Sequence, residues 1–98
     1  MLLYFLSLLE PNKTRRYKKA MSAFLEKHHA TLLEFKYDKW TFGNLYIVMD
    51  YKGHTHKIVT DRGEIYINDK FVSDASYTEK VFDKVLEIIE FEILRGIN

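Results

Sequence analysis

The chain has 98 residues, of which 47% are hydrophobic and 30% are charged, and its formal net charge is +1. This length and composition predict a single domain over residues 1–98, with a true hydrophobic core and an ordinary charged surface. Cysteine is absent, which excludes disulfides and thiolate metal sites and leads us to expect a reducing, cytoplasmic environment.

Residues 1–9 form a strongly apolar start to the chain. The run is too short to cross a membrane, which takes about 20 apolar residues. No basic segment precedes it, and Glu10, Pro11 and Asn12 follow it, so it differs from a secretory signal. We expect a buried element here, either a short helix or an edge strand, because periodicity does not separate the two over so short a run.

Residues 14–28 are predicted to form an amphipathic helix, with Asn12 or Thr14 as its N-terminal cap. Side chains suited to a core recur at spacings of three and four, which places them on one face of the helix. The residues of this face are Tyr17, Ala20, Met21, Phe24 and His28.

The start of this helix is strongly basic. Five of the seven residues from 13 to 19 are cations, namely Lys13, Arg15, Arg16, Lys18 and Lys19. A helix N-terminus carries partial positive charge, so cations are mildly unfavourable there. We therefore predict a partner-binding surface, for an acidic protein or for the phosphates of a nucleic acid; the alternative is a solvated helix face.

The middle of the chain has the pattern of antiparallel strands separated by turns. The predicted strands are residues 31–37, 45–51, 56–60, 64–67 and a short fifth at 70–72. In residues 45–51 apolar side chains occupy both faces, which predicts a central strand covered on both sides. Asp61, Arg62 and Gly63 are typical of a hairpin loop in which glycine supplies a positive φ.

Residues 76–95 are predicted to form a second helix. Ser76 and Glu79 have the spacing of a capping box, and Arg95 and Gly96 mark the end of the helix. A wide apolar stripe lies between these signals, formed by Val81, Phe82, Val85, Leu86, Ile89 and Ile93.

Together these elements predict an α+β fold. A four- to five-stranded antiparallel meander sheet is flanked by an N-terminal basic amphipathic helix and a C-terminal amphipathic helix. The second helix should pack on one face of the sheet. The expected core consists of Phe35, Ile47, Ile58, Ile65, Phe82, Val85 and Ile89.

Aromatic residues make up 15% of the chain, and some of them are hard to place in a core. Trp40 falls in a turn between strands, and Phe91 falls on the charged side of the second helix, with Leu94 beside it. Exposed aromatic rings are frequent anchors of protein interfaces. We therefore predict Trp40, Phe91 and Leu94 as further partner-binding residues, and the Phe91–Leu94 strip as a surface that could form a homodimer.

The chemistry of catalysis and of metal binding is poorly represented. The spacing of His28, His29, His54 and His56 matches no metal-ligand signature, so we predict no metal site and no cofactor; whether the four approach each other stays open. The chain has no glycine-rich phosphate loop, nucleophile elbow or paired-carboxylate motif. We predict no catalytic residues and no enzymatic activity.

Two classes of function are compatible with these features. We expect a small non-catalytic protein-binding module, such as an inhibitor, adaptor or small subunit of the kind that phages and mobile elements encode. The alternative is a nucleic-acid-binding protein that uses residues 13–19. The sequence pI of about 7.9 favours the first class, because dedicated nucleic-acid-binding domains usually have a pI above about 9. We expect no membrane association.

Overall fold

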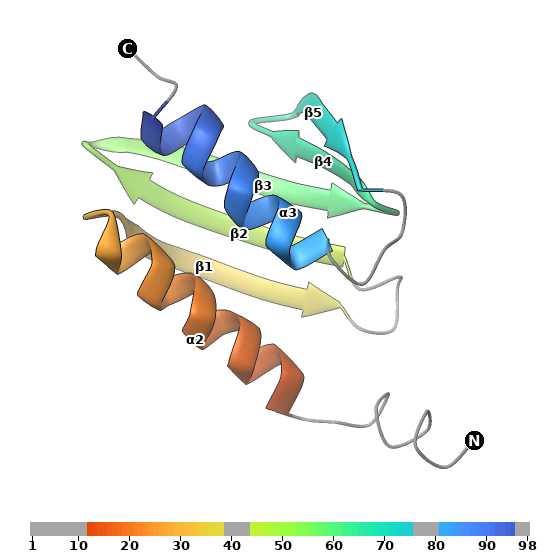
Figure 1. The fold of residues 1–98 in the computed structure, drawn as a ribbon, viewed down its shortest axis with the longest axis horizontal. Helices are drawn as coiled ribbons and strands as arrows, with labels where there is room; N and C mark the ends of the chain where they lie inside the picture. The colour runs from red at the N-terminus through yellow and green to blue at the C-terminus, as the bar shows by residue number, and fades with distance from the viewer. Residues whose placement is uncertain (1–11, 39–43, 76–80, 96–98) are drawn as a thin grey trace.

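The structure, a computed structural model, describes residues 12–38, 44–75 and 81–95 (Figure 1). Its centre is a five-stranded antiparallel sheet in which every strand pairs with its neighbour in sequence. The strands are β1 (Thr31–Asp38), β2 (Asn44–Tyr51), β3 (His54–Asp61), β4 (Glu64–Ile67) and β5 (Lys70–Asp74). This confirms the predicted α+β meander. The predicted element at residues 1–9 and the capping box at Ser76 lie outside the described residues.

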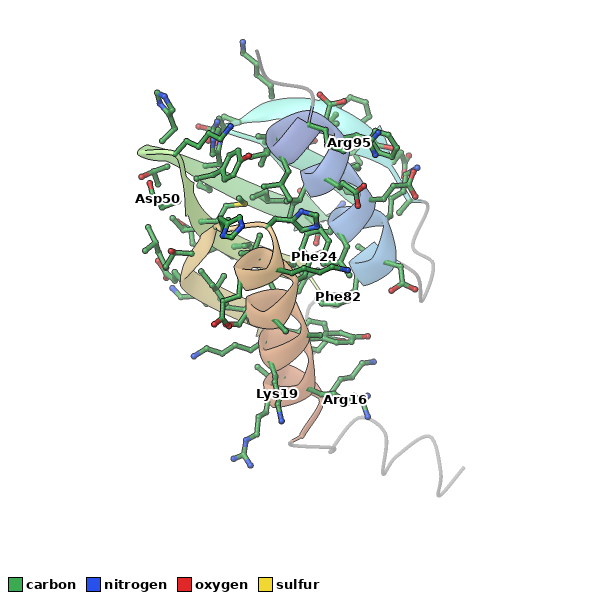
Figure 2. All side chains as sticks on the ribbon, turned by 60° about the vertical axis from the view of Figure 1, so that its left-hand side comes forward. Arg16, Lys19, Phe24, Asp50, Phe82 and Arg95 are labelled. Carbon is green, nitrogen blue, oxygen red and sulfur yellow. The ribbon has the colours of Figure 1, made fainter. Side chains whose placement is uncertain are left out.

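Two helical segments lie side by side on one face of the sheet (Figure 1). They are α2 (Asn12–Lys27) and α3 (Val81–Ile88), which continues into a π-helix, η1 (Ile89–Arg95). The rings of Tyr17 and Phe82 are stacked with their centroids 4.4 Å apart and join the two helices. Figure 2 shows Phe24 and Phe82 in the space between α2 and α3.

The second helix differs from the regular α-helix that the sequence predicts. From Ile89 onward its turns widen to the π-helical pattern. Ile88, Ile89 and Ile93 are all buried, and the wider turn allows the two adjacent isoleucines to face the sheet together.

Tight turns connect the strands from β2 to β5. Lys52 and Gly53, and likewise Arg62 and Gly63, have positive φ at both central positions, as two-residue hairpins of the favoured hand require. In the third hairpin turn, Asn68 and Asp69 adopt the same conformation without glycine. Asparagine and aspartate tolerate this region better than other residues with side chains.

The core lies between the two helices and one face of the sheet. Six of the seven predicted core residues are buried, and Phe35 is only partly buried because it lies on the edge strand β1. The helix face predicted for residues 14–28 is wrong at one position. Ala20 is exposed and Leu25 is fully buried, because Ala20 lies about 100° around the helix from Met21, away from the side that faces the sheet.

The prediction that β2 is covered on both sides is also wrong for the part of the chain that the structure describes. Leu45, Ile47 and Met49 are buried beneath the helices. Tyr46 and Val48 point to the opposite face and are half-buried, and no described element packs over them. Both faces of this strand are apolar, although the described helices cover only one of them.

Substituting valine by aspartate at two positions should distinguish the two faces of the sheet. Val85 is fully buried in α3, so Val85→Asp should lower the free energy of unfolding by about 3 kcal/mol or more through an unpaired buried charge. Val48→Asp, on the uncovered face, should cost only about 1 kcal/mol, mainly through lower strand propensity. Urea denaturation measures both values, and equal costs at the two positions would contradict the one-sided core.

A buried hydrogen bond joins β2 and β3. Thr60 is 2% exposed, and its Oγ1 accepts a hydrogen bond of 2.8 Å from the backbone N–H of Leu45. Thr60→Val keeps the shape of the side chain but leaves this N–H without its partner, so it should cost about 1–3 kcal/mol. Thr60→Ser keeps the hydroxyl and should cost about 1 kcal/mol or less. If the valine variant proves the more stable of the two in thermal denaturation, this bond does not stabilise the sheet.

Candidate interaction surfaces

The predicted basic cluster divides into two groups in the folded chain. Lys13 is partly buried, and its Nζ lies 5.7 Å from the ring centroids of both Tyr17 and Tyr37. This position over two rings is typical of a cation–π contact. It holds the N-terminal turn of α2 against β1. Lys13 therefore contributes to the fold rather than to a free basic surface.

The other cations of the cluster are exposed on α2. Arg15, Lys18 and Lys19 line a shallow groove on the outward side of the helix, together with Ser22, Ala23 and Glu26. We call Arg15, Lys18 and Lys19 the basic stripe. Among the described residues, no ion pair involves these three side chains. Arg16 is also exposed. Figure 2 shows Arg16 and Lys19 in the N-terminal half of α2, far from Arg95.

The predicted aromatic anchors have different surroundings. Trp40 lies outside the described residues. Phe91 is 53% exposed, with the guanidinium carbon of Arg95 5.0 Å from its ring centroid. Leu94 is partly buried against the core, and its carbonyl accepts a hydrogen bond of 3.5 Å from the Tyr51 hydroxyl. Phe91 is thus a single exposed ring, and Leu94 belongs mainly to the edge of the core.

A surface that the sequence did not identify lies on the uncovered face of the sheet. The strand register places Tyr46 opposite Val59, Val59 opposite Tyr66, and Tyr66 opposite Phe71. These four side chains form a row across β2, β3, β4 and β5, which we call the aromatic row. Phe71 is 58% exposed, and its ring meets that of Tyr66 edge to face at 5.8 Å between centroids.

The charges around the aromatic row are mostly negative. By strand register, the same face carries two lysines and six carboxylates: Lys36, Lys57, Glu34, Asp38, Asp50, Asp61, Glu64 and Asp74. Both lysines are ion-paired, Lys36 with Glu34 at 3.2 Å and Lys57 with Asp69 at 2.9 Å. The pairing raises the pKa of Lys57. The uncovered face is therefore apolar along its middle and acidic around it.

The histidines do not form a metal site within the described part of the chain. No group of three His, Cys, Asp or Glu side chains converges there. His28 packs near Phe24, with 5.0 Å between ring centroids, and His29 ends the helical segment with a φ of 62°. His54 and His56 lie on the helix-covered side of β3, at the end of the sheet beyond the core.

The chain was compared with protein-family models, with curated proteins and with solved structures, and none of the three comparisons gave a match. In the described residues no helix has both the length and the apolar character that crossing a bilayer requires. The surfaces described above are therefore the basis for assigning a function.

The signal for the aromatic row is present in the sequence but ambiguous. Tyr46 and Val48 alternate with Leu45, Ile47 and Met49, so β2 has two apolar faces. Alternation alone does not say which face the helices cover. The register that aligns Tyr46 with Phe71, 25 positions later in the numbering, depends on three successive pairings that no local pattern contains.

Proposed function

We propose that this protein is a small, non-catalytic protein-binding module that contacts its partner through the uncovered face of the sheet. The observation that supports this function is the aromatic row of Tyr46, Val59, Tyr66 and Phe71. Tyrosine and other aromatic side chains provide much of the binding energy at protein interfaces. Their alignment across four strands gives one contiguous surface instead of scattered exposed residues.

The charge around the row favours a protein partner over a nucleic acid. Single-stranded nucleic acids bind where aromatic rings lie within a positively charged groove. Here the rings lie among carboxylates, and the basic stripe is on the outward side of α2, which packs on the other face of the sheet. The surface that could stack bases would repel their phosphates. We infer a partner with an apolar patch bordered by basic side chains.

The basic stripe is the second candidate contact. Its three cations lack ion-pair partners among the described residues, so an acidic surface on the same partner could approach them without breaking internal bonds. In this proposal the module acts by contact alone, as an inhibitor, adaptor or small subunit. We place it in the cytoplasm because a chain without cysteine does not depend on disulfides, which form in oxidising compartments.

Two phenylalanines of similar exposure allow a matched test of the uncovered face. Phe71 lies in the aromatic row and is 58% exposed, whereas Phe91 lies on η1 and is 53% exposed. Phe71→Ala should weaken the complex with the natural partner about tenfold or more, the loss typical of an interface anchor. Phe91→Ala should leave the affinity within about twofold, because its ring lies off the proposed interface.

The partner for this test is the protein that co-purifies with the parent chain in stoichiometric amount, purified and titrated by calorimetry. Both variants change a surface side chain, so similar thermal stability should accompany the different affinities. A loss of affinity for Phe91→Ala with normal binding by Phe71→Ala would move the interface to η1. Equal affinities for both variants and the parent would exclude both rings from it.

Charge reversal tests the basic stripe and the nucleic-acid alternative together. Replacing Arg15, Lys18 and Lys19 by glutamate should leave stability within about 0.5 kcal/mol and slow association with the protein partner. The control replaces Lys27, Lys52 and Lys70, three exposed lysines elsewhere, with the same change in net charge. If the parent binds random duplex DNA with an affinity that falls steeply between about 50 and 200 mM salt, and only the stripe variant loses it, the protein is a nucleic-acid binder instead.

A further inference from the structure

A hollow lies at the end of the sheet opposite the basic stripe, between η1 and the turns that join β2 to β3 and β4 to β5. Two adjoining pockets, with cavity volumes of about 480 and 370 Å³, share His56, Asn68 and Ile93 as lining residues. We call this the histidine hollow. Its volume falls in the range of small-molecule sites, which is roughly 300–1,000 Å³. It is separate from the aromatic row, although Phe71 borders one of its rims.

Part of the wall of the hollow is apolar. Leu94 of η1 and Ile67 of β4, both partly buried, line it beside the buried Ile93, and Glu92 of η1 lines the same hollow. The Tyr51 hydroxyl, which donates to the carbonyl of Leu94, holds the end of the π-helix in place. π-Helical turns are rare and occur often at functional sites, and this one forms the wall of the hollow.

One polar group in the hollow has a fixed orientation. The backbone N–H of Asn68 donates to the carbonyl of Lys57 at 2.8 Å, and the Asn68 Oδ1 accepts from the backbone N–H of Lys57 at 2.9 Å. Because the oxygen is held by an N–H donor, the amide nitrogen is on the other side of the group. Its two N–H bonds remain as donors, and Asn68 lines both pockets of the hollow.

The charges that border the hollow favour an anion. Lys70 and Glu92 line one half of it and Lys52 lines the other, so lysines outnumber carboxylates among the lining residues. Neither lysine has an ion-pair partner among the described residues. The Lys52 Nζ lies 5.2 Å from the ring centroid of Tyr51, which holds it near the opening.

His54 and His56 supply the remaining polar atoms. His56 is half-buried, and its burial and the nearby His54 lower its pKa, with a smaller opposing effect from Asp50. This lowering favours the uncharged form of the His56 ring, which has one N–H donor and one acceptor nitrogen. An uncharged ring beside apolar side chains suits the part of an amphipathic molecule that joins its charged group to its apolar chain. It suits a multiply charged phosphate less well.

We propose that the histidine hollow binds a small carboxylate with an apolar chain, with the carboxylate at the Asn68 amide and the two lysines and the chain along Leu94 and Ile67. The charged end then receives charge-assisted hydrogen bonds at the rim, and the chain is removed from water against η1. This site shares Phe71 with the proposed protein interface, but no other residue of the aromatic row lines the hollow. Its test uses small molecules and does not require the partner protein.

The experiment follows backbone amide signals by NMR while hexanoate is added to the full chain. Saturable shifts should appear at His56, Asn68 and Ile93. Hexanol lacks the carboxylate and inorganic phosphate lacks the apolar chain, so each should bind about tenfold more weakly than hexanoate or not at all. Shifts of equal size with hexanol would show a merely apolar groove, and tighter binding of phosphate would show a simple anion site. Either result, or the absence of saturation, would overturn the proposal.

Two asparagines provide a matched pair of variants. Asn68→Asp keeps an oxygen for the Lys57 N–H but replaces the donating amide by a carboxylate oxygen, so hexanoate should bind at least about tenfold more weakly. Asn44 has the same role at the other end of the sheet, where its Oδ1 accepts from the backbone N–H of Arg62 at 3.0 Å. Asn44→Asp should therefore leave hexanoate binding unchanged.

A second variant guards against local unfolding of the Asn68 turn. Lys52→Gln with Lys70→Gln removes both rim charges from exposed positions and should weaken hexanoate binding several-fold without changing the amide spectrum elsewhere. If this variant and Asn68→Asp both bind hexanoate as the parent does, the carboxylate is not held where we place it.

Discussion

Ile47 and Ile58 are paired across β2 and β3 at the centre of the sheet, and both are fully buried. They lie beneath α2 and α3, which meet through the stacked rings of Tyr17 and Phe82. Since both helices use the same face, one side of the sheet forms the core, and no element in the described residues covers the other. The other properties of the molecule follow from this one-sided burial. Successive side chains along a strand point to opposite faces of the sheet, so each one lies either in the core or on the uncovered face.

The one-sided arrangement also separates the charges. The basic stripe lies on the outward side of α2, whereas the carboxylates of the strands surround the aromatic row on the uncovered face. The formal net charge of +1 therefore hides two surfaces of opposite sign. A partner that contacts both surfaces would have to be a macromolecule of mixed charge, which is a property of proteins rather than of nucleic acids.

Much of the fold was predictable from local pattern. Alternation identified Ile47, Ile58 and Ile65 as core residues, and helical periodicity identified Val85 and Ile89, because these signals need only a few neighbouring residues. The uncovered face was not predictable in this way. Tyr46 and Val48 indicate an apolar surface, but only the positions of α2 and α3 show that it is the outer one.

The exposure of the predicted binding residues could be derived from sequence where it follows from helical geometry, but not where it depends on packing. Arg15, Lys18 and Lys19 are exposed on one side of α2 as the spacing indicates, but Lys13 turns toward Tyr17 and Tyr37, and Tyr37 is contributed by the following strand. The histidine hollow was beyond reach for the same reason. Its residues come from four strands, two turns and a π-helix whose wider turns no sequence period revealed.

One face of the sheet forms the core, and we propose that the other, which no described element covers, binds the partner. Methyl NMR with a soluble paramagnetic probe tests it, because broadening reports which methyl groups the solvent reaches. In the free protein we expect strong broadening for the methyl groups of Val48 and Val59 and almost none for those of Ile47 and Ile58. When the partner protein is bound, the broadening of the two valines should be suppressed. If Val48 and Val59 in the free protein are as protected as Ile47 and Ile58, the uncovered face is not a surface and the account is wrong.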